Sequence, residues 1–211
     1  MLIAIDGPAA SGKGTVARML AKHFGLEYLD TGKLYRAVGY NIIKCGIPME
    51  PLYDSKIIAI SEGYIKVLSQ KDLQNPELDT EIVGAYASYV SAIPAIRQML
   101  FDFQRNIASN KEGAVLDGRD IGTVIAPDAN HKFFITADTK IRANRRYKQL
   151  LCSNKDVIEA DILRDILARD ERDSKREVAP LRPASDAIII DSSASEPQEV
   201  FEKIRNIIQT G

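Results

Sequence analysis

The sequence predicts an α/β protein built around a parallel β-sheet. Short apolar runs at 2–5, 114–116, 132–135 and 187–190 have the composition of strands that are buried on both faces. Segments between these runs carry apolar residues three and four positions apart, the spacing of amphipathic helices. A glycine-rich loop joins the first apolar run directly to the first of these helices. Together these observations assign the chain to the α/β class.

Length and composition limit the possible functions. The chain has 211 residues, enough for one domain with or without inserted subdomains. Its net charge is −1, so no overall basic field favours nucleic acid or an anionic membrane. The two cysteines, Cys45 and Cys152, are far apart and are typical of reduced thiols in a cytoplasmic protein. We therefore expect a cytoplasmic protein with neither a nucleic-acid nor a membrane partner, and we take it to be a monomer.

The glycine-rich loop has the pattern of a phosphate-binding loop between a strand and a helix. Gly7 and Gly12 allow backbone conformations that a side chain would block, and they bring backbone N–H groups close to phosphate oxygens. The N-terminus of the following helix adds positive potential, and Lys13 adds a point charge for the β- and γ-phosphates. The predicted ATP-binding residues are Gly7, Pro8, Ala9, Ala10, Ser11, Gly12, Lys13, Gly14 and Thr15.

One position of this loop departs from the common pattern. Gly14 stands where a serine or threonine usually follows the lysine, and the hydroxyl comes one residue later, at Thr15. This Gly-Lys-Gly-Thr order is similar to the variant found in nucleoside monophosphate kinases. It leaves open whether Thr15 contacts Mg²⁺ directly or through water. The alternative is a glycine-rich turn that binds nothing. It is disfavoured because the glycine spacing, the preceding strand and the following helix all match those of a phosphate-binding loop.

A second strand and helix follow the first pair. We expect a short strand at 27–29 and then a helix from about Thr31 to Gly46. Thr31 and Arg36 lie in the first turns of this helix, near the end of the second strand. In open α/β sheets ligands bind at that edge, so both residues are candidates for substrate binding. The alternative role of Thr31 is a helix N-cap.

The stretch from about Met49 to Asp79 carries the weakest patterns. Its apolar runs at 57–60 and 64–68 suggest strands of a small antiparallel insert. Beyond it we expect a helix from about Thr80, with Ile82, Tyr86 and Val90 on one face. A further helix follows Pro94. These two helices carry the polar candidates Ser88 and Arg97, each of which, taken alone, is more typical of a solvated surface.

The third core strand ends in a charged sequence, Asp-Gly-Arg-Asp at 117–120. Two carboxylates around an arginine, at the carboxyl end of a core strand, are a strong local signal for a site. Arg119 is well placed to bind an anion. The alternative is an acidic turn that satisfies its own backbone.

An arginine-rich helical stretch lies between the fourth and fifth strands. Arg169, Arg172 and Arg176 are three and four residues apart, which places them on one helix face. One interpretation is a solvated helix with i,i+4 pairs such as Glu171–Lys175. Given a phosphate loop in the same chain, we favour a mobile segment from which arginines such as Arg169, Arg172 and Arg176 close on the transferred phosphoryl group and exclude water. The arginines of this stretch are Arg142, Arg145, Arg146, Arg164, Arg169, Arg172 and Arg176.

These motifs together resemble the bacterial cytidylate kinase family, nearly from end to end. The most specific segments are Asp-Gly-Arg-Asp-Ile-Gly-Thr at 117–123, Arg-Asp-Glu-Arg-Asp at 169–173 and Ala-Pro-Leu at 179–181. The resemblance implies a P-loop, three-layer α/β fold with a five-stranded parallel sheet in the order 2-3-1-4-5, flanked by helices. It also implies a core of 1–30, 109–144 and 179–211, a nucleotide-binding region at 31–108 and a helical lid at 145–178.

The resemblance further implies a reaction and its residues. ATP would phosphorylate CMP or dCMP, giving ADP and CDP or dCDP, with Mg²⁺. Lys13, Arg119, Arg172 and Arg176 would be catalytic. The cytosine would contact Thr31, Ser88, Arg97 and Asp120; the acceptor phosphate would contact Arg36, Arg119 and Arg176; the sugar would contact Arg169 and Asp173.

Physical chemistry indicates how such a reaction proceeds. The nucleophile is a phosphate oxygen that is already anionic near neutral pH, so no general base is required. The protein has to hold two polyanions in line and neutralise the moving charge. Two alternatives are a kinase for another nucleoside monophosphate or small acceptor and a nucleotide-hydrolysing switch. A switch would need a water-positioning residue and a partner surface, and the sequence carries a signature of neither.

Overall fold

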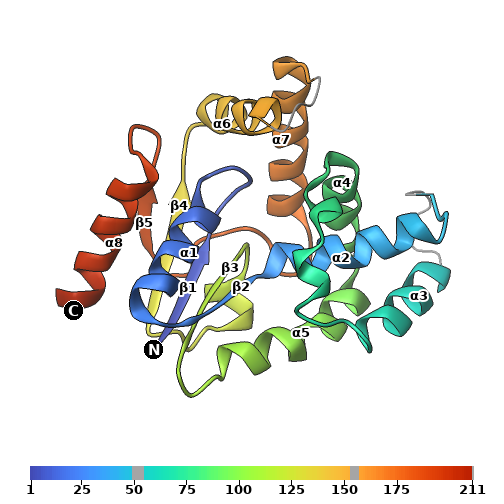
Figure 1. Ribbon diagram of the computed structural model, residues 1–211, viewed down its shortest axis with the longest axis horizontal. Helices are drawn as coiled ribbons and strands as arrows, with labels where there is room; N and C mark the ends of the chain where they lie inside the picture. The colour runs from blue at the N-terminus through green and yellow to red at the C-terminus, as the bar shows by residue number, and fades with distance from the viewer. Residues whose placement is uncertain (49–54, 153–156, 211) are drawn as a thin grey trace. The chain divides into compact units, whose positions relative to one another are not determined.

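The computed structural model describes residues 1–48, 55–152 and 157–210. The chain divides into two compact units, Met1–Leu29 with Ala108–Gly211, and Asp30–Ile107. Figure 1 traces the chain with its helices and strands labelled.

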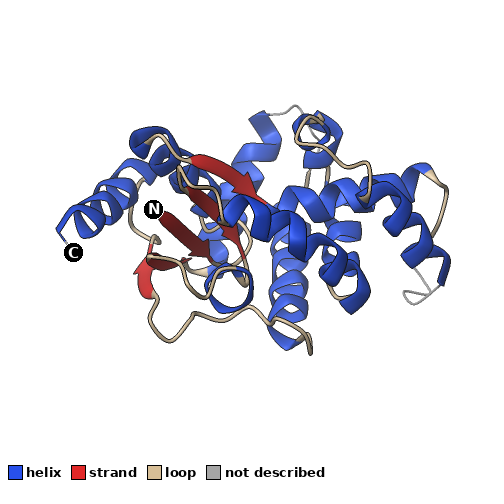
Figure 2. Ribbon diagram, turned by 90° about the horizontal axis from the view of Figure 1, so that it is seen from below, coloured by secondary structure: helices blue, strands red, loops and turns tan. Residues whose placement is uncertain are grey.

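The first unit is organised around a five-stranded parallel sheet in the order β2-β3-β1-β4-β5, which confirms the predicted strand order. The strands are drawn red and the helices blue in Figure 2. In this sheet β1 pairs with β3 and β4, and β4 pairs with β5. The strand bounds are β1 Leu2–Asp6, β2 Glu27–Asp30, β3 Ala114–Gly118, β4 His131–Thr136 and β5 Ile188–Asp191.

Helices pack against the central strands because apolar side chains on both elements can be buried together. Ile3, Phe133 and Ile135 of the sheet form one core cluster with Leu20 of α1 (Lys13–Phe24) and Ile204 of α8 (Pro197–Thr210). The predicted period of α1 is confirmed, since Val16 and Leu20 are buried and Phe24 packs on the cluster. The other helical elements of this unit are the π-helical turn η3 Ile121–Ile125, α6 Thr139–Cys152 and α7 Glu159–Lys175.

In the described part of the second unit the regular elements are helices, apart from Asp30, the last residue of β2. Its elements are α2 Thr31–Lys44, α3 Ser55–Ile65, the short 3₁₀ helices η1 Asp72–Gln74 and η2 Pro76–Asp79, α4 Glu81–Val90, and α5 Pro94–Ala108. The α2 helix packs against both α3 and α4. Asp30 caps α2, because its Oδ1 accepts a hydrogen bond from the Lys33 N–H at 3.2 Å. Thr31 is therefore the first helical residue and not the N-cap.

Two expectations for the second unit are wrong. The apolar runs at 57–60 and 64–68 do not form strands; α3 covers most of them, and Ile57 and Ser61, four residues apart, are its buried residues. The β-branched residues in these runs favoured a strand assignment, but burial along one helical face decides the structure. In α4 the buried face carries Val83 and Ala87, whereas Ile82 is 60% exposed. The part of the expected insert at 49–54 lies outside the described residues.

Among the described residues, no helix combines the length and apolar composition needed to cross a membrane.

Candidate active site

The phosphate loop has the geometry that its glycines predict. At Gly7 a Cβ atom would lie 2.0 Å from the Ile135 carbonyl oxygen, so only glycine fits between β1 and β4. Gly12 caps α1 with φ 85°, in the left-handed region that glycine adopts without strain. The N-terminus of α1, with the N–H groups of its first turn, follows directly after this residue. The loop therefore presents backbone donors at a position suited to a phosphate group.

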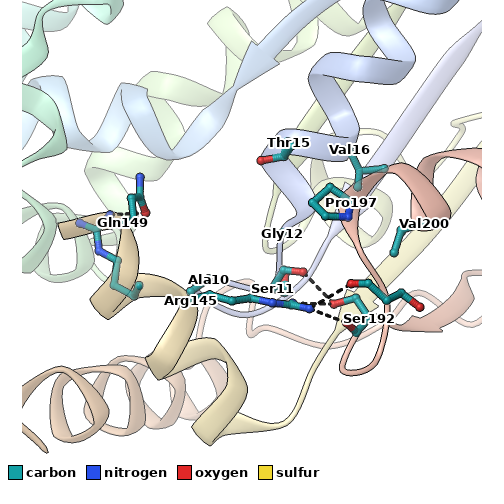
Figure 3. A pocket seen from close by; sticks show the side chains of 12 residues that line it. Ala10, Ser11, Gly12, Thr15, Val16, Arg145, Gln149, Ser192, Pro197 and Val200 are labelled. Atoms are coloured by element: carbon teal, nitrogen blue, oxygen red, sulfur yellow. Dashed lines mark hydrogen bonds between the residues drawn. The ribbon is translucent and has the colours of Figure 1, made fainter. Parts of the chain in front are cut away.

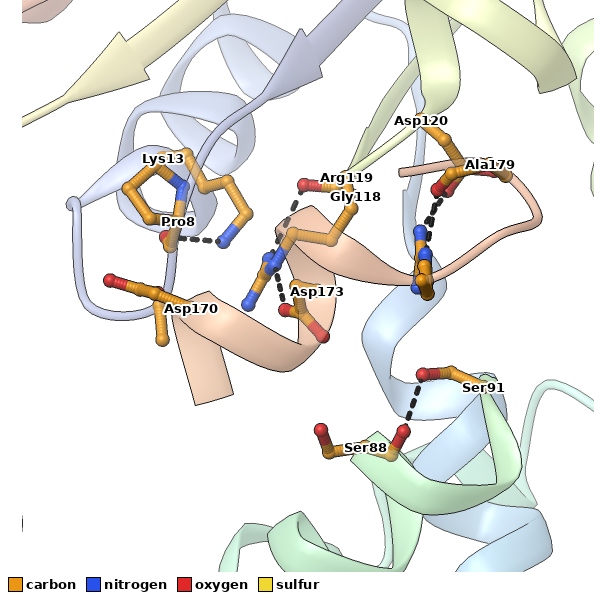
Figure 4. Close-up of polar contacts among 12 residues, drawn as sticks. Pro8, Lys13, Ser88, Ser91, Gly118, Arg119, Asp120, Asp170, Asp173 and Ala179 are labelled. Atoms are coloured by element: carbon orange, nitrogen blue, oxygen red, sulfur yellow. Dashed lines mark hydrogen bonds and ion pairs between the residues drawn. The ribbon is translucent and has the colours of Figure 1, made fainter. Parts of the chain in front are cut away.

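Polar side chains of the loop lie near this helix N-terminus. The Lys13 ammonium group donates to the Pro8 carbonyl oxygen at 3.4 Å (Figure 4). In the described part of the chain the buried Ser11 hydroxyl has no hydrogen-bond partner, so it is available to a ligand oxygen. The Thr15 hydroxyl, in the first turn of α1, accepts a long hydrogen bond of 3.5 Å from Arg18.

A pocket of about 210 Å³ adjoins the loop (Figure 3). The Arg145 guanidinium of α6 donates to the Ser192 hydroxyl at 3.0 Å and to the Ser192 carbonyl oxygen at 2.6 Å. The Ser192 hydroxyl lies 3.0 Å from the Ser11 carbonyl oxygen. Sequence patterns did not identify this wall, because Arg145 and Ser192 are 47 positions apart in the chain. The lining residues are Ala10, Ser11, Gly12, Thr15, Val16, Arg145, Arg146, Gln149, Ser192, Ser195, Pro197 and Val200.

Asp117 lies beside the start of α1 and explains the unusual glycine there. A Cβ atom at position 14 would lie 3.0 Å from the Asp117 Oδ2, closer than side chains tolerate without a shift. The same oxygen accepts a 2.7 Å hydrogen bond from the Tyr28 hydroxyl. Gly14 therefore leaves room for this carboxylate next to Lys13 and Thr15. The sequence indicates Asp117 only as one carboxylate of the charged turn at 117–120, whereas its contact with the phosphate loop is visible in the structure alone.

Asp6, the last residue of β1, anchors the turn that follows Asp120. Its carboxylate accepts hydrogen bonds from the Ile121 and Gly122 N–H groups, each at 2.8 Å. Asp6 is only 3% exposed, and this burial raises its pKa to about 7, against the opposing effect of the two N–H groups. One buried carboxylate thus connects the strand that leads into the phosphate loop with the charged turn after β3.

Arg119 and Asp173 form a buried ion pair. The Arg119 Nε donates to the Asp173 Oδ2 at 2.9 Å, between the end of β3 and the last turn of α7 (Figure 4). Burial acts to lower the pKa of Arg119, but the charges of Asp173 and its acidic neighbours hold that pKa above its ordinary value. Burial acts to raise the pKa of Asp173, but Arg119 and then Arg169 hold it below its ordinary value. Both side chains therefore stay charged.

Asp120 pairs with Arg176. Both side chains are buried, and the Arg176 Nη2 lies 3.5 Å from the Asp120 Oδ1, while its Nε donates to the Ala179 carbonyl oxygen at 2.6 Å. The expected common helix face for Arg169, Arg172 and Arg176 is wrong in part, because α7 ends at Lys175 and Arg176 has extended backbone. The structure nevertheless brings Arg119, Asp120, Asp173 and Arg176 together through these two ion pairs.

The solvated interpretation of the arginine-rich stretch holds for part of it. Glu171 and Lys175 form the expected exposed ion pair at 2.7 Å. Arg169, by contrast, acts electrostatically on the buried Asp173. Arg172 lies in the last turn of α7. One helix thus combines an exposed ion pair with charges directed at a buried cluster.

The second unit holds its four candidate residues on α2, α4 and α5. Thr31 and Ser88 are 3% and 4% exposed. Arg97 is also buried; it donates to the Ser91 carbonyl oxygen at 3.1 Å and stacks over the Tyr35 ring at 5.5 Å. The Ser91 hydroxyl donates in turn to the Ser88 carbonyl oxygen at 2.8 Å (Figure 4). These contacts hold a buried guanidinium near a buried serine.

Arg36 is fixed on α2 by backbone acceptors. Its Nη1 donates to the carbonyl oxygens of Leu78 at 2.6 Å and of Thr80 at 3.1 Å. A Cβ atom at Gly84 of α4 would lie 3.0 Å from the Arg36 guanidinium. The charge of Arg36 is therefore held against α4 by the segment around η2.

The donor set of the first unit suits anions more than a protein-held metal. Backbone N–H groups, Lys13 and several arginines surround the loop and the charged turn. The described residues contain no group of three or more histidine, cysteine, aspartate or glutamate side chains that could hold a metal ion. Thr15 and Asp117 supply one hydroxyl and one carboxylate beside the loop. That set is typical of Mg²⁺ bound mainly through nucleotide phosphates and water.

Comparisons with known proteins agree with this chemistry. The family model described as cytidylate kinase matches residues 3–210. The chain is 50% identical over 193 residues to a cytidylate kinase from Bradyrhizobium sp. (strain ORS 278), covering 92% of this chain and 88% of that protein. It is 49% identical over 209 residues to a cytidylate kinase from Rhodopseudomonas palustris (strain BisA53), covering 99% and 96%. Among solved structures, it is similar in fold to an uncharacterized protein from Eubacterium ventriosum, with a TM-score of 0.58, 16% identity, and coverage of 100% and 99%.

Proposed function

We propose how this chain, which belongs to the cytidylate kinase family, carries out the phosphorylation of CMP or dCMP by ATP. The observation that carries the proposal is the phosphate loop, in which Gly12 caps α1 and Lys13 opens it. We propose that the triphosphate of ATP lies against the N–H groups of residues 7–15, with Lys13 at the β- and γ-phosphates. The adjoining pocket, with Arg145 and Ser192 in its wall, would receive the nucleoside of ATP.

We propose Mg²⁺ as the metal that accompanies ATP. Thr15 and Asp117 are the side chains that would hold it, directly or through water, together with the phosphates. When bound, Mg²⁺ neutralises part of the phosphate charge. The rest of the charge is compensated by the chain's own cations.

The acceptor residues are proposals carried by the family motifs. The burial of Thr31, Ser88, Arg97 and Asp120 supports the base-binding roles, since a buried charge or hydroxyl can discriminate among ligands only where water is excluded. The arginines at 119 and 176 are already held by Asp173 and Asp120, which fixes their direction before a substrate binds. We propose that the cytosine contacts Thr31, Ser88, Arg97 and Asp120, the acceptor phosphate contacts Arg36, Arg119 and Arg176, and the sugar contacts Arg169 and Asp173.

Phosphoryl transfer requires that the two substrates are held in position and that the negative charge on the transferred group is compensated. A phosphate oxygen of CMP is the nucleophile, and it needs no base to activate it near neutral pH. We propose that Lys13, Arg119, Arg172 and Arg176 stabilise the negative charge that spreads over the transferred group. Their role is electrostatic, so the reaction needs no proton transfer from these residues.

We propose that the regions of the chain divide this work. Residues 31–108 would bind the acceptor, and residues 145–178 would act as a lid that closes when both substrates are present. If so, hydrogen exchange in α6 and α7 slows with a two-substrate analogue. Exchange that stays unchanged would indicate an ordinary surface helix pair. The segment 153–156 of this region lies outside the described residues.

The experiment that tests the function is ADP formation from ATP with a panel of acceptors. We expect fast turnover with CMP or dCMP, slow turnover with UMP and AMP, and negligible turnover with water alone. Equal turnover with another monophosphate would make the chain a kinase of different specificity. ADP formation without any acceptor would support a hydrolysing switch. We also propose that the protein is a cytoplasmic monomer. The cytoplasmic compartment is supported by the two free, exposed cysteines at 45 and 152.

A further inference from the structure

A buried arginine outside the residues assigned above contacts the phosphate loop from α6. Arg142 is 4% exposed. Its Nη1 donates to the Ala9 carbonyl oxygen at 3.0 Å and pairs with the Asp170 Oδ2 of α7 at 2.6 Å. Its Nε donates to the Ala137 carbonyl oxygen at 2.9 Å, and its Nη2 donates to the Thr139 hydroxyl at 2.8 Å. The guanidinium therefore meets four acceptors, an arrangement that suits its planar shape and fixed fork of donors.

The contact with Ala9 controls the direction of the next backbone donor. In a trans peptide group the C=O and the N–H point in opposite directions. Arg142 draws the Ala9 carbonyl towards α6, so the N–H of Ala10 points away from the guanidinium. Ala10 has φ 57°, a left-handed conformation that is strained for alanine and persists only when its surroundings hold it. The hydrogen bond from Arg142 to the Ala9 carbonyl oxygen is one contact that fixes the orientation of the Ala9–Ala10 peptide group.

We infer that Arg142 is a positioning residue for the ATP phosphates: it fixes the Ala9–Ala10 peptide group so that the Ala10 N–H is ready for a phosphate oxygen. Asp170 acts through Arg142 by compensating its buried charge. In the described part of the chain the other Asp170 oxygen, Oδ1, is buried without a hydrogen-bond partner, so this carboxylate depends on the arginine in turn. The inference rests on the proposed binding of ATP at the loop.

The test is calorimetric titration of the full chain with ATP and with inorganic tripolyphosphate. Arg142→Ala is expected to bind both ligands roughly 10- to 100-fold more weakly, the effect of losing a hydrogen bond to a charged group. Arg142→Lys keeps a charge for Asp170 but cannot meet all four acceptors, so it is expected to show a smaller loss. Arg164→Ala is the matched control, because Arg164 is an exposed arginine of α7 paired only with Asp161 in the described contacts. It is expected to bind as the unmodified chain does.

Chemical rescue separates positioning from general support of the fold. Millimolar guanidinium is expected to restore part of the tripolyphosphate affinity of Arg142→Ala, whereas urea, which has a similar shape but no charge, is expected to restore none. Adding Asp170→Asn to Arg142→Ala is expected to weaken binding no further, since Asp170 acts through the arginine. Circular dichroism establishes that each variant is folded, and Arg142→Lys keeps the test valid if Arg142→Ala does not fold.

Two results would overturn the inference. One is folded Arg142 variants that bind tripolyphosphate with unmodified affinity. The other is a loss that urea rescues as well as guanidinium does. Lys13→Ala distinguishes this failure from failure of the proposed function. If Lys13→Ala weakens tripolyphosphate binding and the Arg142 variants do not, only the role of Arg142 is wrong; if Lys13→Ala has no effect either, the assignment of the loop to ATP is wrong.

Discussion

Replacing Asp6 with asparagine is predicted to change how the stability of the enzyme depends on pH. The Asp6 carboxylate is 3% exposed and accepts two N–H groups at 2.8 Å, from Ile121 and Gly122. Burial raises its pKa from 3.8 to about 7, and the nearby charge of Asp120 acts in the same direction. Asparagine has nearly the same size and does not titrate.

The sign of the effect follows from proton binding. The folded chain holds the Asp6 proton more tightly than the unfolded chain does, because the folded pKa is the higher one. The stabilisation is therefore complete below about pH 3.8 and is lost as the pH rises through about 7. At 1.36 kcal/mol per pH unit the whole effect is roughly 4 kcal/mol, of which about 2–3 kcal/mol falls between pH 5 and pH 8.

Urea denaturation of the unmodified enzyme and of Asp6→Asn, each at pH 5 and at pH 8, measures this change in the free energy of unfolding. Subtracting the two free energies of unfolding removes groups that titrate alike in both proteins. The difference, enzyme minus variant, is expected to fall by about 2–3 kcal/mol from pH 5 to pH 8. A difference that stays constant, or that grows with pH, would refute the reasoning, because it would mean that the two N–H bonds outweigh burial.

Three further substitutions test the charged turn and the loop. Gly14→Ala is expected to cost about 1–3 kcal/mol of stability, because its new Cβ would lie 3.0 Å from a carboxylate oxygen; Gly63→Ala, which meets open space in a helix, is the control, and equal thermal melts would contradict the packing argument. Arg119→Ala is expected to cost about 3–5 kcal/mol in urea denaturation, because it leaves Asp173 buried without its partner. The double variant Arg119→Ala/Asp173→Ala should lose less, and a simple sum of the two single losses would argue against the pair. Asp120→Asn is expected to bring the kcat/KM ratio of CMP to UMP towards unity, since an amide can donate to uracil O4; equal weakening of both substrates would make Asp120 structural.

The phosphate loop could be predicted from the sequence because its conformation depends on residues that are neighbours in the chain. Glycine spacing, a lysine and a following helix determine the backbone within nine consecutive residues, and the structure has the left-handed Gly12 that this pattern requires. The five strands were also predictable, since buried parallel strands appear as apolar runs. The strand predicted at 57–60 was wrong because an isoleucine-rich segment can form either a strand or the buried face of a helix. Only tertiary packing decides between the two.

The pairing of charges could not be predicted from the sequence. Arg119 and Asp120 are neighbours in the chain, yet each pairs with a residue more than 50 positions away, Asp173 and Arg176 respectively. The roles of Asp6 and Arg142 were hidden for the same reason, because their partners are backbone groups of distant segments. A motif shows which residue types are present, whereas the partners of each depend on how the strands and helices meet.

Rapid-quench turnover of ATP labelled at its γ-phosphate, with and without CMP, tests the central claim most directly. We predict that the label appears in CDP only when CMP is present. Lys13→Ala is expected to slow that step by on the order of a hundredfold or more while its thermal melt stays unchanged. Label that appears as inorganic phosphate at the same rate without CMP, or a Lys13→Ala variant as fast as the unmodified enzyme, would contradict the claim that this loop transfers phosphate from ATP to CMP.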